Sequence, residues 1–183
     1  DMLYILYDNE VYGLTKGQAG PTLGLGEKPK SLPRPNPQGK VNPLLLAFAS
    51  GYTWIARGYA YDVKGLKELI KEGIAHRGLA FLHVLQPCPT YNDLHTKEWF
   101  APRLYRLEEE GYDPLVPPGL PPEALEARMA RFQQKALEWG ERIPVGVFWK
   151  AELPTFEARL KAYLPRYPEA YPARGPETPL DLE

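Results

Sequence analysis

Three short apolar runs in the first half of the chain have the length and composition of β-strands, at residues 2–7, 53–57 and 79–85. The first run is continuous and is bounded by Asp8 and Asn9, a pattern typical of a strand buried on both faces of a parallel sheet. The third has the same continuous character. We therefore expect both of these strands to lie inside a sheet rather than at its surface.

Helical patterns separate the three predicted strands. Asn42 and Pro43 form a favourable helix start, and residues 44–50 continue that helix until Gly51 ends it. Asp62 is the predicted cap of a second helix, in which apolar residues recur every three or four positions until Gly78 stops it. Strands alternating with helices at these lengths indicate right-handed βαβ crossovers, and so an α/β fold with a mainly parallel sheet flanked by helices.

The second half of the chain has a different pattern. It predicts short helices at 94–100 and 102–110, a proline-rich turn at 113–122, an amphipathic helix at 122–139, a strand at 145–149 and a last helix at 155–163. The inward side of the amphipathic helix is predicted to carry Leu125, Met129, Phe132, Ala136 and Leu137, and that of the last helix Phe156, Leu160 and Tyr163. The last dozen residues contain three prolines and predict a tail laid along a surface.

Composition narrows the class of protein. Lys and Arg total 22 against 23 for Asp and Glu, which argues against a protein that wraps nucleic acid or binds membranes through basic residues. The longest apolar runs are too short to cross a membrane, and no basic-then-apolar signal segment opens the chain. The single cysteine, Cys88, excludes an internal disulfide framework. We expect a globular, cytoplasmic protein without membrane or nucleic-acid partners.

Proline is in excess, with 21 residues, and part of that excess forms a connector within 23–43. Its proline-rich portion, 27–43, carries one acidic and four basic residues, which indicates a stiff surface excursion. The chain opens directly on a strand that a parallel sheet normally reaches through a preceding helix. We therefore expect a further segment ahead of residue 1.

The loop after the first strand carries the candidate chemistry, because ligands bind beyond the carboxyl ends of parallel strands. Asn9 offers a side-chain oxygen and Val11 a main-chain carbonyl, which are hard ligands suited to Mg²⁺. The glycines at 13 and 17 let backbone approach a phosphate, Thr15 adds a hydroxyl and Lys16 a positive charge. A diphosphate held through Mg²⁺ fits this loop, and so does a plain polar loop with two turn glycines.

Four strings in the chain resemble the β subunit of the 2-oxoacid:ferredoxin oxidoreductases, which are thiamine-diphosphate enzymes with iron–sulfur clusters. They are DNEVYGLTKGQ, WIARGYAYDVKGLKELIKEGIAHRG, VLQPCPTYND and IPVGVFWKAELPTFEARL, in the family's order. The resemblance implies a thiamine-diphosphate-binding fold whose C-terminal part covers 1–88, with the connector 23–43, followed by a helical and extended β-subunit extension over 89–183.

The resemblance also assigns roles to residues. Asn9 and the Val11 carbonyl would bind Mg²⁺, while Gly13 and Leu14 would contact thiamine diphosphate, with Thr15 close by. Cys88 would be the last of four cysteines that bind a [4Fe–4S] cluster; its other interpretation is a buried structural thiol. Lys16, at a position that varies with substrate range in the family, is predicted to pair with the distal carboxylate of a substrate such as 2-oxoglutarate.

The chain departs from the family pattern in its lack of the Gly-Asp-Gly segment, which provides the Mg²⁺ carboxylate, and of the other three cluster cysteines. We therefore expect roughly a hundred further residues ahead of the chain, enough for the missing βα units. Asp8 belongs to the strand end and Glu10 is expected to point away from the cofactor. His76, His83 and His95 have no metal-ligand spacing, and we expect the four tryptophans in the core or at a subunit interface.

The function implied is oxidative decarboxylation of 2-oxoglutarate or pyruvate to an acyl-CoA, with electrons passing to ferredoxin. The partner would be an α subunit, in a heterodimer or a dimer of heterodimers, and that subunit would carry the group that assists the cofactor; this chain alone is expected to be inactive. Two alternatives are a non-oxidative thiamine-diphosphate lyase or transferase, in which Cys88 is structural, and a non-catalytic interaction subunit.

Overall fold

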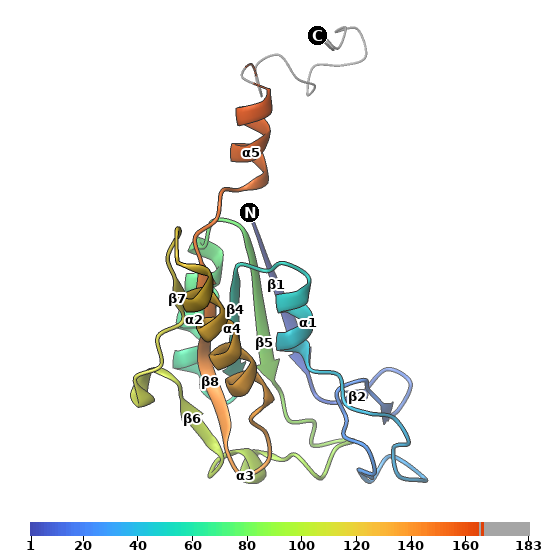
Figure 1. Ribbon diagram of the computed structural model, residues 1–183. Helices are drawn as coiled ribbons and strands as arrows, with labels where there is room; N and C mark the ends of the chain where they lie inside the picture. Colours follow the sequence, from blue (N-terminus) through green and yellow to red (C-terminus); the bar gives the residue numbers. More distant parts are fainter. Residues whose placement is uncertain (165, 167–183) are drawn as a thin grey trace, which may run out of the picture. The chain divides into compact units, whose positions relative to one another are not determined.

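A mixed sheet forms the centre of the first of two units, Asp1–Glu152, in the computed structural model, which describes residues 1–164 and 166 (Figure 1). Its strands follow the order β1-β5-β4-β8-β6, with β7 also beside β8. The neighbours β1, β5 and β4 are parallel, whereas β8 runs antiparallel to β4 and parallel to β6 and β7. The bounds are β1 Met2–Asp8, β4 Trp54–Tyr59, β5 Leu79–Leu85, β6 Leu104–Arg106, β7 Leu115–Val116 and β8 Ile143–Ala151.

Helices α1 and α2 begin where the sequence predicts. The Asn42 side chain accepts hydrogen bonds from the Leu44 and Leu45 amides at the start of α1, and Asp62 accepts one from the Gly65 amide at the start of α2. The bounds are α1 Pro43–Ala49, α2 Val63–Ala75, α3 Lys97–Phe100 and α4 Pro122–Leu137, with a 3₁₀ turn at Glu108–Glu110. The predicted α/β fold with helices beside a largely parallel sheet is confirmed.

Helices cover both faces of the sheet because successive strand residues point to opposite sides. On one face, Ile55 and Phe148 pack with residues of α1 and α4. On the other, Trp54 and Leu82 pack against α2 through residues that include Leu66. The molecule therefore has a helix layer on each side of the sheet (Figure 1).

The first strand is less buried than its apolar run predicts. Met2, Tyr4 and Tyr7 are about half exposed, and β1 forms one edge of the sheet, with β5 as its neighbour. Burial on both faces requires packing partners on each side, and the described part of the chain provides them for Leu3, Ile5 and Leu6 and leaves residues on both faces exposed. The prediction of a strand buried on both faces is therefore wrong for β1 and correct for β5, whose residues after Leu79 are all buried.

Three predictions in the second half are also wrong. Residues 102–110 form β6 and the 3₁₀ turn instead of a helix, because Leu104–Arg106 pair with β8 and tertiary pairing overrides local preference. Helix α3 is limited to Lys97–Phe100, capped by Thr96. Leu137 is exposed although it was expected to face inward, whereas Phe132 and Ala136 are buried as predicted.

The second unit, from Leu153 onward, contains α5, Phe156–Tyr163, whose start is capped by Thr155. Phe156 and Tyr163 are exposed, so the inward orientation predicted for them is wrong. The predicted C-terminal tail lies outside the described residues. Among the helices of the described residues, none has both the length and the apolar character that a membrane span needs.

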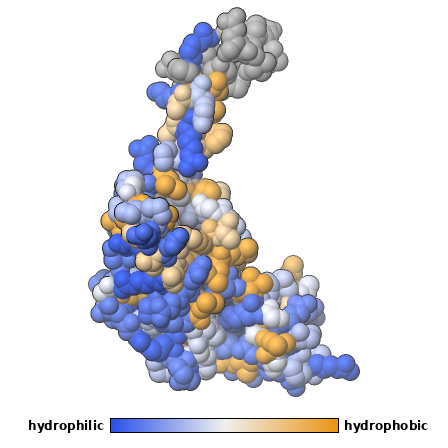
Figure 2. All heavy atoms as spheres, viewed as in Figure 1, coloured by the Kyte–Doolittle hydropathy of each residue, from blue (hydrophilic) through white to orange (hydrophobic). Residues whose placement is uncertain are grey.

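A hairpin follows β1 and leads into the connector. Its strands are β2, Val11–Tyr12, and β3, Gln18–Ala19, and no helix or strand interrupts 20–42. Hydrophobic residues gather on the surface over the neighbouring α1, where Leu46 is exposed (Figure 2). The hairpin and the connector together form the side of the unit on which the candidate site lies.

Candidate functional site

Two loops leave the sheet side by side, because β1 and β5 are parallel neighbours and end together. Asp8 is paired with Leu85 at the ends of these strands, and the Gln86 amide donates to the Asp8 carbonyl at 2.9 Å. The first loop carries Asn9 and Val11, and the second carries Cys88. Residues separated by some eighty positions are thereby brought to one edge of the sheet, where open α/β sheets bind ligands.

Asn9 and Val11 are held together by a local hydrogen bond. The Val11 amide donates to the side-chain oxygen of Asn9 at 3.1 Å, an Asx turn that leaves a second lone pair on that oxygen. Val11 itself is buried. The loop therefore presents a preformed pair of neighbouring residues with oxygen ligands.

The other predicted contacts of the loop lie on the turn of the hairpin and are exposed. Leu14 is 99% exposed, and a methyl group added at Gly13 would meet no atom within 4 Å. The Thr15 hydroxyl donates to the side chain of Gln18. Lys16 has a φ of 74°, and no other described residue forms an ion pair with it. This part of the loop is free to meet a ligand or another chain.

Asp8 is bound within the protein. Its Oδ1 accepts from the Glu10 amide and from the Thr22 hydroxyl, and its Oδ2 lies 2.8 Å from His83 Nε2. The Arg57 Nε–H donates to His83 Nδ1 at 3.2 Å, so the neutral ring carries its proton on Nε2 and donates it to Asp8. Arg57, His83 and Asp8 thus form a buried chain of polar groups across three neighbouring strands.

Burial has opposing effects on the groups of this chain. Desolvation lowers the pKa of Arg57 to about 10, partly offset by Asp8, and it also lowers the pKa of His83. Desolvation opposes ionisation of Asp8 as well, but the hydrogen bonds from His83, Thr22 and Glu10 outweigh it, and the pKa of Asp8 is lowered. Asp8 is therefore the counter-ion of Arg57, with the neutral His83 between them.

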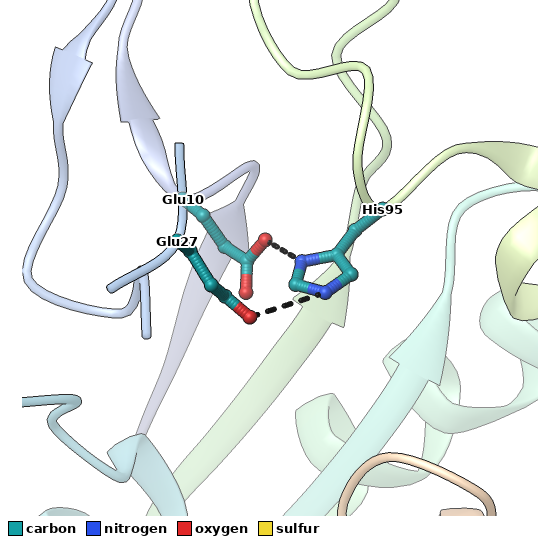
Figure 3. A group of neighbouring side chains, drawn as sticks. All are labelled: Glu10, Glu27 and His95. Atoms are coloured by element: carbon teal, nitrogen blue, oxygen red, sulfur yellow. Dashed lines mark hydrogen bonds and ion pairs between the residues drawn. The ribbon is translucent and has the colours of Figure 1, made fainter. Parts of the chain in front are cut away.

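Glu10 belongs to a second group of polar side chains, which we call the Glu10 cluster: Glu10, Glu27, Lys40, Asn92 and His95. Figure 3 shows Glu10, Glu27 and His95 of this cluster. His95 Nδ1 hydrogen-bonds to the Glu10 carboxylate, and its Nε2 lies 3.5 Å from Glu27 Oε1. Lys40 approaches the other Glu10 oxygen at 3.3 Å and lies over the Trp139 ring. Desolvation lowers the pKa of Lys40, against the field of Glu10.

Glu10, Glu27 and His95 have ligand atoms close enough to hold a metal ion. The two nitrogens of His95, however, face two different carboxylates, and Lys40 already provides a positive charge to Glu10. The cavity bordered by Glu10, Asn92 and His95 is only about 10 Å³. The Glu10 cluster is accordingly a closed network of hydrogen bonds and ion pairs.

A cleft of about 830 Å³ lies elsewhere, between α2 and the strands β6 to β8. Several of its charged residues are paired, as in Asp62 with Arg106 and Glu72 with Lys150. None of the predicted site residues borders it. This cleft is therefore not the place where the predicted ligands of the Asn9 loop would bind a cofactor.

Cys88 is half-buried, and no disulfide involves it. Its carbonyl accepts a hydrogen bond from the Asn92 amide at 2.9 Å, and the Asn92 side chain donates to the Asn9 carbonyl at 3.3 Å. Asn92 therefore connects the loop of Asn9 with the loop of Cys88.

The roles of His83, His95 and Asn92 were not foreseen from the sequence. The spacing of neighbouring residues does not predict contacts between residues that lie some 75 to 85 positions apart in the chain. One available signal was Arg57 within a predicted strand, since an arginine buried in a sheet requires polar partners. Trp54 and Trp149, in contrast, are buried in the core, as expected for tryptophans.

Two family models match consecutive parts of the chain. The model described as "Thiamine pyrophosphate enzyme, C-terminal TPP binding domain" matches residues 1–84, and the model for the C-terminal part of the pyruvate ferredoxin oxidoreductase beta subunit matches residues 88–164. The 2-oxoacid:ferredoxin oxidoreductase subunit beta of Sulfolobus sp is 58% identical over 176 residues, covering 95% of this chain and 57% of that protein. Its counterpart from Saccharolobus solfataricus is 53% identical over 175 residues, covering 94% and 56%.

A solved structure agrees with these relatives. The 2-oxoglutarate:ferredoxin oxidoreductase from Magnetococcus marinus, with 2-oxoglutarate, coenzyme A and succinyl-CoA bound, superposes with a TM-score of 0.71 at 30% identity. The superposition covers 90% of this chain and 52% of that one, and this chain likewise spans little more than half the length of the two curated relatives. Because the two family models and these relatives together match nearly the whole chain, it belongs to the β-subunit family of the 2-oxoacid:ferredoxin oxidoreductases.

Proposed function

We propose that the chain is part of the β subunit of an enzyme that oxidatively decarboxylates a 2-oxoacid, 2-oxoglutarate or pyruvate, to an acyl-CoA and passes electrons to ferredoxin. The observation that carries this proposal is the placement of the Asn9 loop and the Cys88 loop at one edge of the sheet. Electrons can pass from the thiamine cofactor to the iron–sulfur cluster only if the residues that bind the cofactor lie close to those that bind the cluster. The partners would be an α subunit and ferredoxin, in the cytoplasm.

The donors in the Asn9 loop fit Mg²⁺ and the diphosphate of thiamine diphosphate. The side-chain oxygen of Asn9 and the carbonyl of Val11 are hard ligands for Mg²⁺, and Gly13, Leu14 and Thr15 lie on the exposed turn beside them. The carboxylates of Asp8 and Glu10 are fully hydrogen-bonded within the protein, so the carboxylate ligand would come from another part of the β subunit. The binding site of this chain is thus one side of a larger one.

When bound, thiamine diphosphate supplies the carbanion chemistry of decarboxylation. This chain would hold the metal through Asn9 and Val11 and would orient the diphosphate at Gly13. Lys16, exposed and without an ion-pair partner among the described residues, would bind the distal carboxylate of a dicarboxylic 2-oxoacid. We assign no residue of this chain as the catalytic base.

Cys88 fits a shared cluster ligand because it is a free, half-buried thiol between two prolines at the edge of the sheet. A [4Fe–4S] cluster needs four thiolates, and the sequence contains one cysteine, so three would come from outside it. The cluster would therefore be closed only in the longer subunit.

The experiment that tests the proposal is anaerobic purification of the intact β subunit with its native partner, for the natural protein and for Cys88→Ser. We expect a brown chromophore, bound iron and sulfide, and CoA-dependent reduction of ferredoxin by a 2-oxoacid in the natural protein. The Cys88→Ser protein is expected to lose the chromophore and the electron transfer and to keep its fold. A natural protein without iron that still decarboxylates a 2-oxoacid would contradict the oxidative function.

A further inference from the structure

Asn92 makes hydrogen bonds with both loops at the sheet edge although it is only 2% exposed. Its amide nitrogen Nδ2 donates to the Asn9 carbonyl at 3.3 Å and to the Glu10 carboxylate at 3.1 Å. Its backbone N–H donates to the Cys88 carbonyl at 2.9 Å. Its side-chain oxygen accepts from the Leu94 and His95 amides and so shapes its own loop. All polar groups of this side chain are therefore used in a fixed arrangement.

Glu10 needs such an anchor because its backbone is in the left-handed region, with a φ of 65°. Side chains with a Cβ adopt this conformation at a cost, unless surrounding contacts hold them there. The contacts here are those of its carboxylate with Asn92, His95 and Lys40, and the close approach of Gly20, whose amide donates to the Glu10 carbonyl at 2.7 Å. Glu10 lies between Asn9 and Val11, so its conformation sets where their oxygens lie.

On the basis of the proposed function, we propose that Asn92 is a positioning residue that sets the Mg²⁺ and thiamine-diphosphate loop relative to the Cys88 loop. Its side chain holds the Asn9 carbonyl and the Glu10 carboxylate, and its backbone N–H binds the Cys88 carbonyl. Its side-chain oxygen also accepts from the amide of His95, whose ring binds Glu10. Asn92 touches the backbone of one ligand residue from each loop. The backbone bond to the Cys88 carbonyl would remain after a change of the Asn92 side chain, but the Asn9 loop would lose its hold on the Cys88 loop. A shift between the two loops would alter the binding of the diphosphate and the environment of the cluster together.

Asn36 provides a matched control. It is also buried, its Nδ2 donates to the carbonyls of Leu23, Gly24 and Gln38, and its Oδ1 accepts from the Gln38 amide. Its hydrogen bonds stay within the connector region, 23–38. Asn→Asp at either position removes the buried donors and keeps the acceptor. At position 92 the new carboxylate also faces the Glu10 carboxylate, whereas at position 36 it faces backbone carbonyls.

The test compares Asn92→Asp, Asn36→Asp and the natural protein as the intact enzyme. The measurements are the Kd for thiamine diphosphate at saturating Mg²⁺, the electron paramagnetic resonance spectrum of the reduced cluster, and the thermal unfolding midpoint. For Asn92→Asp we expect about tenfold or more weaker binding of the diphosphate together with an altered cluster spectrum. For Asn36→Asp we expect a comparable loss of thermal stability with a Kd within about twofold of natural.

The proposal is overturned if Asn92→Asp binds thiamine diphosphate as Asn36→Asp does and has the natural cluster spectrum. If Asn92→Asp does not assemble, His95→Gln serves in its place, because glutamine keeps a donor for Glu10 and loses the contact with Glu27. We then expect a smaller change in the diphosphate Kd and in the cluster spectrum. The absence of both changes overturns the proposal. Failure of the proposed function is distinct, because the natural protein itself would then lack a bound cluster, whether or not it binds the cofactor.

Discussion

His83 donates from Nε2 to Asp8 Oδ2 at 2.8 Å, at the level where β1 and β5 end and the Asn9 loop begins. The same ring accepts a hydrogen bond from Arg57 on the next strand. Three strands of the sheet are thus connected by a chain of buried polar groups directly beneath the candidate site. The stability of this edge and the placement of the loop therefore depend on the same contacts.

Replacement of Asp8 tests the counter-ion role. Asp8→Asn keeps a similar shape but removes the negative charge that compensates the buried Arg57. We expect the free energy of unfolding to fall by about 2–3 kcal/mol, as for a buried charge that loses its partner. Asp113→Asn is the control, because Asp113 is half exposed in its pair with Arg128, and a change of about 0.5 kcal/mol or less is expected there. Equal effects in chemical denaturation would contradict the counter-ion role of Asp8.

The pH dependence of stability follows from the neutral state of His83. Because burial lowers the pKa of His83 from its ordinary value of 6.5, the unfolded chain binds a proton at a higher pH than the folded protein does. The contribution of neutral His83 to the free energy of unfolding is fully present above about pH 6.5, the unfolded pKa, and is lost as pH falls through the lower folded pKa. Asp8, whose pKa is also lowered, adds a further loss as pH falls below its unfolded pKa, ordinarily 3.8.

The measurement is the unfolding midpoint as a function of pH in the natural protein and in His83→Gln. Glutamine can donate to Asp8 and accept from Arg57 without titrating, so we expect the part of the decline just below pH 6.5 to become shallower. His76→Gln is the comparison, since the pKa of His76 is also lowered by desolvation and by Lys150, but its ring is only partly buried. An unchanged slope in His83→Gln would show that folding does not lower the pKa of His83.

Lys16→Gly tests the substrate contact with little disturbance of the backbone. Glycine adopts the observed φ of 74° freely, so the fold should be kept. In the intact enzyme we expect kcat/KM for 2-oxoglutarate to fall about 10- to 100-fold relative to that for pyruvate, as for the loss of a charge-assisted hydrogen bond. Lys28→Ala, at another exposed lysine, should leave the ratio unchanged. An unchanged ratio in Lys16→Gly would remove Lys16 from substrate binding.

Gly13→Ala separates a ligand contact from a structural role. A methyl group at residue 13 meets no protein atom within 4 Å, so the unfolding midpoint should not change. If the diphosphate packs against this glycine, we expect its Kd to rise about tenfold or more, because a Cβ would occupy the contact. Gly39→Ala is the matched control, since its added methyl also meets nothing, and it should leave both quantities unchanged. Equal cofactor binding by the two variants would argue against contact at Gly13.

Patterns of neighbouring residues were sufficient to predict the elements that depend on contacts between neighbouring residues. Asn42 and Asp62 cap the helices they were predicted to cap, because a cap depends on a hydrogen bond to an amide two or three residues away. The apolar run of β5 was buried as predicted, since its neighbours β1 and β4 lie on either side. The resemblance of the four quoted motifs likewise led to the family to which the relatives belong.

The sequence by itself thus determined the class of fold, the helix starts and the loop that carries the candidate ligands. Tertiary structure alone decided that Leu104–Arg106 is a strand, because its pairing partner β8 lies some forty residues away. It also decided that Glu10 faces His95 and Lys40, and that Asn92 connects Asn9 with Cys88. Apart from the local bond between Asn92 and Cys88, these contacts join positions about 30 to 85 residues apart, and they form only when parallel strands bring the ends of separate loops to one edge of the sheet.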